Sequence, residues 1–209
     1  MGCGSFGAKQ PPIFMSEVLS TFSLPQGATA PDFTLPDASG KPHSLAEVRG
    51  AKGLVVAFLC NHCPYVIHLA PSLGKQAAEW ARQGVGFVGI NANDVERYPA
   101  DRPERMVTTA REYGWEFPYL YDATQEVARA YAAACTPDFY LFDGDLRLTY
   151  CGQYDASRPG NGKPVTGSDL QAAILSILAG TGPVRNQRPS SGCNIKWKAG
   201  NEPGYFLKR

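Results

Sequence analysis

Apolar and polar residues alternate in blocks along the chain, and two continuous apolar runs stand out. Residues 54–59 and 85–90 each form a run of strand length, as is typical of strands that are covered on both faces in a parallel sheet. Between these runs, over residues 66–84, apolar residues recur at helical spacing. The pattern therefore predicts a β-α-β unit.

Weaker patterns follow this unit. Helical spacing predicts two helices, around residues 102–113 and 125–133. Two further apolar runs, 139–142 and 146–150, enclose an Asp-Gly pair, which is a turn typical of antiparallel hairpins. We therefore expect an antiparallel pair of strands after the helices.

A last helix is expected to begin at Ser168, which forms a capping box with Gln171, and to stop at Gly180. Ahead of the β-α-β unit, strand-like residues on both sides of residues 37–40 predict a small N-terminal hairpin. This order of elements specifies an α/β fold with a mixed sheet and helices on both faces.

The boundaries of this pattern divide the chain into three predicted parts. Residues 1–29 form an N-terminal lead, residues 30–182 the domain itself, and residues 183–209 a C-terminal tail without periodicity. The tail contains Ile195 and Trp197, whose apolar area favours packing on the domain. We expect it to fold back onto the Gly/Pro-rich loop 158–164.

Composition narrows the function classes. The chain has 209 residues, 44% hydrophobic, with 20 Lys and Arg against 19 Asp and Glu, so no basic excess favours a nucleic acid partner. The longest apolar run is far shorter than the about 18 residues of a membrane span, so no membrane partner is expected. The N-terminus has no apolar signal core, which indicates a cytoplasmic protein.

The candidate chemistry lies directly after the first strand, at Cys60-Asn-His62-Cys63. A helix N-terminus favours a thiolate, and two intervening residues allow the second thiol to close a disulfide. We expect Cys60 to attack, with a pKa below that of a free thiol, and Cys63 to resolve. A positive charge on His62 favours the thiolate further.

The alternative for this motif is half of a zinc site. Structural zinc needs four ligands, and the other candidates, His68, Cys135, Cys151 and Cys193, form no second pair of suitable spacing. We therefore expect neither a metal nor another cofactor.

Two of these other cysteines remain candidates for an accessory redox role. Cys135 lies two residues before Pro137 and is either near the active pair or packed as a small apolar residue. Cys193, in the tail, is either a third redox thiol or part of a structural contact, and packing is the more common role of such residues.

Thr136-Pro137 stands where the closing hairpin begins. A proline at the first residue of a central strand requires special geometry, and a cis peptide bond is one such geometry.

Together these elements resemble the thioredoxin-fold redoxins of the alkyl hydroperoxide reductase/thiol-specific antioxidant superfamily, over about residues 30–180. The strand followed by Cys-x-x-Cys, the Thr-Pro pair and the Ala-Pro-Asp-Phe lead at residues 30–33 carry this resemblance. Bacterial thioredoxin family proteins share four more specific motifs with the chain: Cys-Asn-His-Cys-Pro at 60–64, Ala-Cys-Thr-Pro-Asp-Phe at 134–139, Arg-Pro-Gly-Asn-Gly-Lys-Pro at 158–164 and Gly-Cys-Asn-Ile-Lys-Trp-Lys at 192–198.

The resemblance implies a thioredoxin-like mixed sheet with flanking helices, an N-terminal hairpin and a C-terminal extension. It implies that Pro137 is cis, that its loop lies across Cys60, and that the backbone of Thr136 can pair with an extended substrate segment. It also implies a bacterial, cytoplasmic setting.

Three positions depart from the patterns of this superfamily. Thioredoxins have a buried Asp six residues before the first cysteine, where this chain has Leu54, so proton transfer must use another group, such as His62 or water. Their helix proline stands eight residues after the first cysteine, and here Pro71 stands eleven after Cys60. Peroxiredoxins have Thr three residues before the reactive cysteine. In this chain the residue three positions before Cys63 is Cys60.

The sequence therefore predicts a thiol-disulfide oxidoreductase that acts on protein or small-thiol disulfides and is served by an unidentified reducing system. The first alternative is a thiol peroxidase with an antioxidant role, although the peroxiredoxin Thr and Arg are missing. The second is a copper-binding chaperone, which is disfavoured because copper-handling relatives place three residues between their cysteines.

Overall fold

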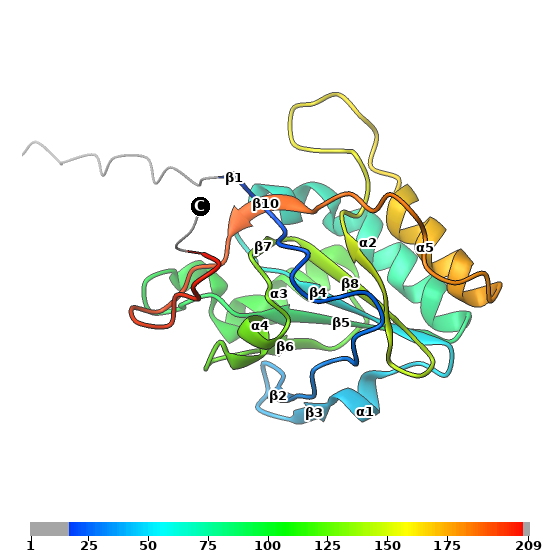
Figure 1. The fold of residues 1–209 in the computed structure, drawn as a ribbon. Helices are drawn as coiled ribbons and strands as arrows, with labels where there is room; N and C mark the ends of the chain where they lie inside the picture. The colour runs from blue at the N-terminus through cyan, green and yellow to red at the C-terminus, as the bar shows by residue number, and fades with distance from the viewer. Residues whose placement is uncertain (1–16, 207–209) are drawn as a thin grey trace, which may run out of the picture.

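The computed structural model describes residues 17–206, and its centre is a five-stranded mixed sheet (Figure 1). The strand order is β6-β5-β4-β8-β9. The strands are β4 (Gly53–Phe58), β5 (Val85–Asn91), β6 (Tyr119–Tyr121), β8 (Asp138–Asp143) and β9 (Leu148–Gly152). β4 runs parallel to β5 and antiparallel to β8, so the predicted mixed sheet is confirmed.

Helix α2 (Pro64–Arg82) connects β4 to β5 and completes the predicted β-α-β unit. Every residue of β4 is buried, which explains why the strand is apolar throughout. Helices α2, α3 (Pro103–Tyr113) and α5 (Ser168–Leu178) contribute to the hydrophobic cluster on one face of the sheet. Helices α1 (Leu45–Val48) and α4 (Glu126–Ala130) contribute to the cluster on the other face. Helices therefore lie on both faces of the sheet, as predicted.

The N-terminal hairpin is also confirmed, as β2 (Thr34–Pro36) paired antiparallel with β3 (Pro42–Ser44). The short helix α1 after it was not predicted. It begins with a complete capping box, in which the Ser44 side chain accepts from the backbone N–H of Glu47, and the Glu47 carboxylate accepts from that of Ser44.

The capping box predicted for α5 is wrong. The N-cap residue is Gly167, at φ +66°, and Ser168 is the first helical residue. A backbone carbonyl from another segment replaces the local cap, because the Tyr154 oxygen accepts hydrogen bonds from the N–H groups of Asp169 and Leu170, both at 3.2 Å. The helix ends as expected, with Gly180 at φ +68° directly after its C-cap.

A second, three-stranded sheet has the order β1-β10-β7 and lies against the site. It pairs β1 (Glu17–Leu19) and β7 (Cys135–Thr136) with β10 (Ser191–Asn194), a strand in the tail that was not predicted. The tail does fold back, and Ile195 and Trp197 are buried. It does so by pairing with β7, so its expected seat on loop 158–164 is wrong; the three-part division of the chain stays a prediction.

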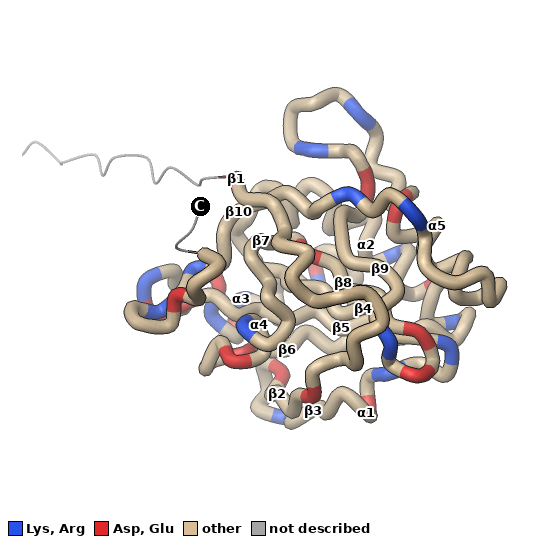
Figure 2. Tube along the Cα trace, in the orientation of Figure 1, with Lys and Arg blue, Asp and Glu red and all other residues tan. Residues whose placement is uncertain are grey.

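Charged residues of both signs are distributed over the loops and helix surfaces, as Figure 2 shows. A 3-10 turn, η1 (Pro99–Asp101), precedes α3 and carries one of the few fully buried carboxylates. Among the described helices, none combines the length and apolarity that a membrane crossing requires.

Candidate active site

The two cysteines of the Cys-x-x-Cys motif lie at the carboxyl end of β4, but they relate differently to helix α2. Cys63 is the N-cap residue of α2, and Pro64 is its first residue. The N–H groups of Val66 and Ile67 donate to the Cys63 carbonyl, both at 3.0 Å. Cys60 stands in the loop before the helix, so Cys63 is the cysteine at the helix N-terminus.

Thr136 contacts both thiols from the opposite side. Its Oγ1 lies 3.3 Å from Cys60 Sγ. Its carbonyl oxygen accepts a hydrogen bond from the Cys63 thiol at 3.2 Å. The Thr136–Pro137 peptide is cis. The loop therefore lies across the cysteine pair as the resemblance implied.

The structure adds a third thiol to this pair. Cys193 Sγ, on β10, lies 2.7 Å from Cys63 Sγ. All three cysteines are buried, with exposed fractions of 1% for Cys60, 0% for Cys63 and 1% for Cys193. The sequence motif Gly-Cys-Asn-Ile-Lys-Trp placed Cys193 among the candidates, but no local pattern showed that it would face Cys63.

A buried carboxylate anchors the loop of the motif. Asp101 accepts hydrogen bonds from the backbone N–H of Asn61 at 2.8 Å and from the side-chain amide of Asn93 at 2.7 Å. Its Oδ2 also lies 2.7 Å from His62 Nδ1, and His62 stacks on the ring of Tyr98. Asp101 was missed in the sequence because it comes from a 3-10 turn, about 40 residues after the motif, with no local signature.

Asp101 affects the charge of its neighbours. Its hydrogen bond and its negative charge raise the pKa of His62, although burial acts in the opposite direction. His62 also interacts favourably with a negatively charged Cys63. The expected positive charge beside the thiols is thus supported by a carboxylate behind it.

The expected low pKa of Cys60 is wrong for this arrangement. Burial raises the pKa of the Cys60 thiol well above its ordinary value, and a hydrogen bond to Cys63 and the negative charge of Asp101 raise it further. Cys60 is therefore held as a neutral thiol.

Cys63 is the cysteine whose environment favours the thiolate. Burial alone would raise its pKa, but hydrogen bonds from the Cys193 and Cys60 thiols hold the pKa of Cys63 below its ordinary value. Backbone N–H groups, including that of Val66 at the start of α2, act in the same direction. The Thr136 carbonyl can accept a hydrogen bond only from the protonated thiol and opposes this effect, but the donors outnumber it.

The position of Pro71 inside α2 agrees with the assignment of the thiolate to Cys63 in place of Cys60. Pro71 stands eight residues after Cys63, which is the spacing that thioredoxins have after their first cysteine. A signal for this was present in the sequence, since a proline at the first helical position, here Pro64, marks the residue before it as the N-cap.

Three side chains of the site have the composition of a metal site. The ligand atoms of Cys60, His62 and Asp101 lie within 4.8 Å of one another. Both oxygens of Asp101 already accept N–H donors, and one of them contacts the imidazole directly. Asp101 is therefore already engaged by its donors and by His62, whereas the Cys60 thiol is hydrogen-bonded to Thr136.

The edge that was expected to receive an extended substrate segment is occupied. β10 pairs antiparallel with β7 so that Cys193 is opposite Thr136 and Asn194 is opposite Cys135. The expectation that the Thr136 backbone is open for pairing is therefore wrong while β10 is in place. Cys135 itself is buried, and its thiol donates to the Pro137 carbonyl at 3.6 Å.

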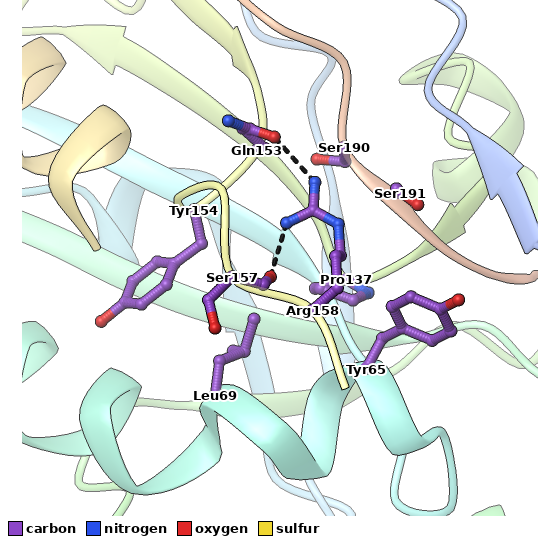
Figure 3. Close-up of a pocket in the computed structure, with 9 residues that line it drawn as sticks. All are labelled: Tyr65, Leu69, Pro137, Gln153, Tyr154, Ser157, Arg158, Ser190 and Ser191. Atoms are coloured by element: carbon purple, nitrogen blue, oxygen red, sulfur yellow. Dashed lines mark hydrogen bonds between the residues drawn. The ribbon is translucent and has the colours of Figure 1, made fainter. Parts of the chain in front are cut away.

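Arg158 lines a small pocket together with other side chains that include Pro137, Tyr65 and Ser191 (Figure 3). Its guanidinium donates to the carbonyls of Asp155 and Ser157 and to Oε1 of Gln153, each at 2.7 Å. Arg158 thus holds its own loop, and among the described residues no arginine hydrogen-bonds to Cys60 or Cys63.

Known proteins share this arrangement of elements. A hypothetical protein of Sinorhizobium meliloti, whose crystal structure is solved, is 49% identical and superposes with a TM-score of 0.84, covering 87% of this chain and 99% of that one. Solved structures of proteins named as thioredoxins, disulfide oxidoreductases or isomerases, and a peroxidoxin, which are 20–24% identical, superpose with TM-scores of 0.52 to 0.59, so the expected thioredoxin-like fold is confirmed.

Two curated relatives have names that describe thiol chemistry. A Mycobacterium tuberculosis protein, named as a candidate peroxiredoxin, is 31% identical over 62% of this chain and 79% of that protein. The thiol-disulfide oxidoreductase ResA of Geobacillus thermodenitrificans is 33% identical over 56% of this chain and 63% of that protein. The model of the AhpC/TSA family matches residues 26–151, and the chain therefore belongs to the AhpC/TSA family.

Proposed function

We propose that the protein is a thiol-disulfide oxidoreductase in which Cys63 is the attacking thiol. The observation that supports this most strongly is the environment of Cys63, which is the N-cap of α2 and accepts hydrogen bonds that favour its thiolate. Because the thiolate is the nucleophile in disulfide exchange, Cys63 is better prepared than Cys60 to attack a disulfide. The name of the ResA relative supports the same reaction class.

The remaining members of the site have supporting roles in this proposal. His62 supplies positive charge near the thiolate, and Asp101 positions and charges His62. Thr136 and Pro137 cover the pair and fix the orientation of the sulfurs. Cys135, packed against Pro137, has no step in the proposed reaction.

Disulfide reductase assays on single-residue variants test this proposal. We expect Cys63→Ser to reduce the dithiothreitol-driven rate at least about 100-fold on a small aromatic disulfide, because the nucleophile is lost. The matched control is Cys151→Ser, a buried cysteine in the cluster on the opposite face of the sheet. A Cys63→Ser protein that keeps the wild-type rate would overturn the assignment.

The substrate is proposed to be a protein or small-molecule disulfide, and the enzyme is proposed to be reduced by a cellular thiol system in a bacterial cytoplasm. Cys60, Cys63, Cys151 and Cys193 are thiols in the structure, which fits a reducing compartment. Subcellular fractionation followed by thiol trapping tests this setting, and recovery of the protein in an oxidising compartment would contradict it.

A thiol peroxidase is the second candidate, because the full burial of Cys63 favours a very small substrate. The Mycobacterium tuberculosis relative has a name of this class. Since no described arginine hydrogen-bonds to the Cys60 or Cys63 thiol, we expect slow oxidation by hydrogen peroxide. Stopped-flow rates for peroxide and for a small disulfide, measured on the same reduced protein, decide between the two candidates.

A further inference from the structure

The contact between Cys63 and Cys193 is closer than an ordinary packing contact. The two sulfurs are 2.7 Å apart, within about 0.7 Å of the S–S bond length of about 2.05 Å. Neither residue is exposed by more than 1%, and the two lie 130 positions apart in the sequence. A small side-chain movement is therefore enough to join them.

A glycine allows the strand that carries Cys193 to come this close. A Cβ on Gly192 would lie 2.0 Å from the Thr136 carbonyl oxygen and 2.7 Å from its carbonyl carbon, distances that no side chain tolerates. With glycine at that position, β10 packs directly on the peptide that also contacts Cys63. The next residue, Cys193, then stands opposite Thr136 and meets Cys63.

The same strand is fixed from its other edge and from its C-terminal end. β1 pairs with β10 with Val18 opposite Gly192. After the strand, the backbone N–H of Lys196 donates to Asn93 and its carbonyl accepts from Asp94. Cys193 is thus held on a paired strand that is anchored on both sides, whereas Cys60 lies in a loop.

We propose that Cys193 is a catalytic residue of the disulfide exchange and that the oxidised enzyme carries a Cys63–Cys193 disulfide. This inference rests on the proposed function, because it assigns the second thiol of that reaction. In the first step the Cys63 thiolate attacks a substrate disulfide, forms a mixed disulfide and releases one substrate thiolate. In the second step Cys193 attacks Cys63 Sγ and releases the other substrate thiolate.

The reaction is balanced. The substrate gains two electrons and becomes two thiols, and the enzyme loses two electrons and becomes the disulfide. The product thiols take one proton from Cys193 and one from solvent, because Cys63 reacts as the thiolate. An external dithiol reverses both steps and returns the enzyme to its reduced form. No other oxidant or reductant is needed.

The electrostatics of the site give the two steps an order. In the reduced protein the hydrogen bond to Cys63 raises the pKa of the Cys193 thiol, so that Cys193 keeps its proton while Cys63 is the thiolate. Once Cys63 is in a mixed disulfide it has no negative charge, and this cause disappears. Burial, which raises the pKa of Cys193, and the positive charge of Lys196, which lowers it, are unchanged by this step. Cys193 is therefore a better nucleophile after the first step than before it.

Disulfide mapping of the wild-type protein tests the inference. Reduced protein is oxidised with one equivalent of hydroxyethyl disulfide, quenched by acid, alkylated and digested for mass spectrometry. We expect the linked peptides to contain Cys63 and Cys193, with Cys60 alkylated. A Cys60–Cys63 link with Cys193 alkylated would overturn the inference and leave the proposed function intact, whereas no disulfide or adduct at any of the three thiols would contradict the proposed function itself.

Variants provide a second test that is independent of the map. With Cys193→Ser we expect the hydroxyethyl adduct to accumulate on Cys63 and turnover to fall at least about tenfold, because the second step is lost. Cys193→Ala serves as a second variant, and circular dichroism verifies folding. Cys151→Ser is the matched control and should behave as wild type. Wild-type turnover in both Cys193 variants would overturn the inference.

Discussion

Two buried aspartates lie near the carboxyl end of β4, and they have different hydrogen-bond environments. Asp101 accepts N–H donors on both oxygens, from Asn61 and Asn93, and contacts His62. Asp138 accepts from the Tyr140 hydroxyl at 3.2 Å, and its Oδ1 has no hydrogen-bond partner among the described residues. Both carboxyl groups have an exposed fraction of 0%.

The difference shows how burial of the same side chain leads to different chemistry. Because its donors compensate for lost water, Asp101 can act as an anion that positions His62. Burial raises the pKa of Asp138 to about 7, since its few hydrogen bonds compensate only in part. The loop side of the site, at residues 61 and 62, therefore holds a charged group. The strand side, where β7 and β8 meet, holds a carboxyl group that titrates near neutrality.

The largest expected effect is on the pH dependence of stability, and it comes from Asp138. The folded state binds the Asp138 proton more tightly than the unfolded state, in which the pKa is about 4. The contribution of Asp138 to stability is therefore fully present below about pH 4 and is lost as pH rises to about 7. In Asp138→Asn this loss, at most about 4 kcal/mol, should disappear.

Urea denaturation of the wild-type protein and of Asp138→Asn, at about pH 5 and about pH 8, measures how the free energy of unfolding of each depends on pH. Asp145→Asn, in the exposed β8–β9 turn, is the control. Equal pH dependence of stability in wild type and Asp138→Asn would show that the two aspartates do not differ as described.

The next largest effect concerns Gly192 on β10, the strand that brings Cys193 to Cys63. Gly192→Val should slow formation of the Cys63–Cys193 disulfide about 100-fold, because a misplacement of about 1 Å has this cost in a positioned reaction. Gly204→Ala is the matched control, since a Cβ there meets no atom within 4 Å. Quenched-flow alkylation measures the rate, and an unchanged rate in Gly192→Val would contradict the role of the close approach.

The loop side should show a smaller effect. Asp101→Asn removes the anion beside His62, so we expect the pKa of His62 to fall and the rate of the first exchange step at neutral pH to drop about tenfold, an effect of about 1.4 kcal/mol. Nuclear magnetic resonance titration of His62 reports the pKa independently of activity. If that titration is the same in wild type and Asp101→Asn, the positioning role of Asp101 is excluded; Asp145→Asn is again the control.

The smallest effect is expected in the titration of Cys63 itself. Its thiolate, followed by ultraviolet absorbance, should persist to lower pH than that of a free thiol, whose pKa is about 8.5. Cys193→Ala should raise this pKa, because a hydrogen-bond donor to the thiolate is lost. A lower or unchanged pKa in that variant would mean that Cys193 does not stabilise the thiolate.

The scaffold was predictable because burial leaves a strong pattern. β4 and α2 were found from continuous and periodic apolar residues, since both pack in the core of the sheet. β10, with the sequence Ser-Gly-Cys-Asn, has no such pattern because its position depends on pairing with β1 and β7. A pairing of this kind is set by residues far away in the chain and has no local signal.

The sequence predicted most of the residues that form the site, but it did not predict which cysteine is the thiolate. The cysteines of the motif, Thr136 and the cis peptide were identified in advance, but the thiolate was assigned to Cys60. That assignment failed because the helix was taken to begin at the first cysteine, whereas Pro64 starts it after Cys63. The contribution of Asp101 depends on tertiary contacts with residues 61, 62 and 93, which no single segment encodes.

The position of β10 between β1 and β7 has a consequence for the order of synthesis. A ribosome makes β1 and β7 long before β10, yet the two strands do not pair with each other, and the middle strand joins them only when residues 191–194 emerge. Until then the edge of β7 is unpaired and Cys63 lacks its cover from the tail. The nascent protein therefore carries an open thiol pair until residues 191–194 have been made, and a segment that is synthesised 130 residues after Cys63 closes it.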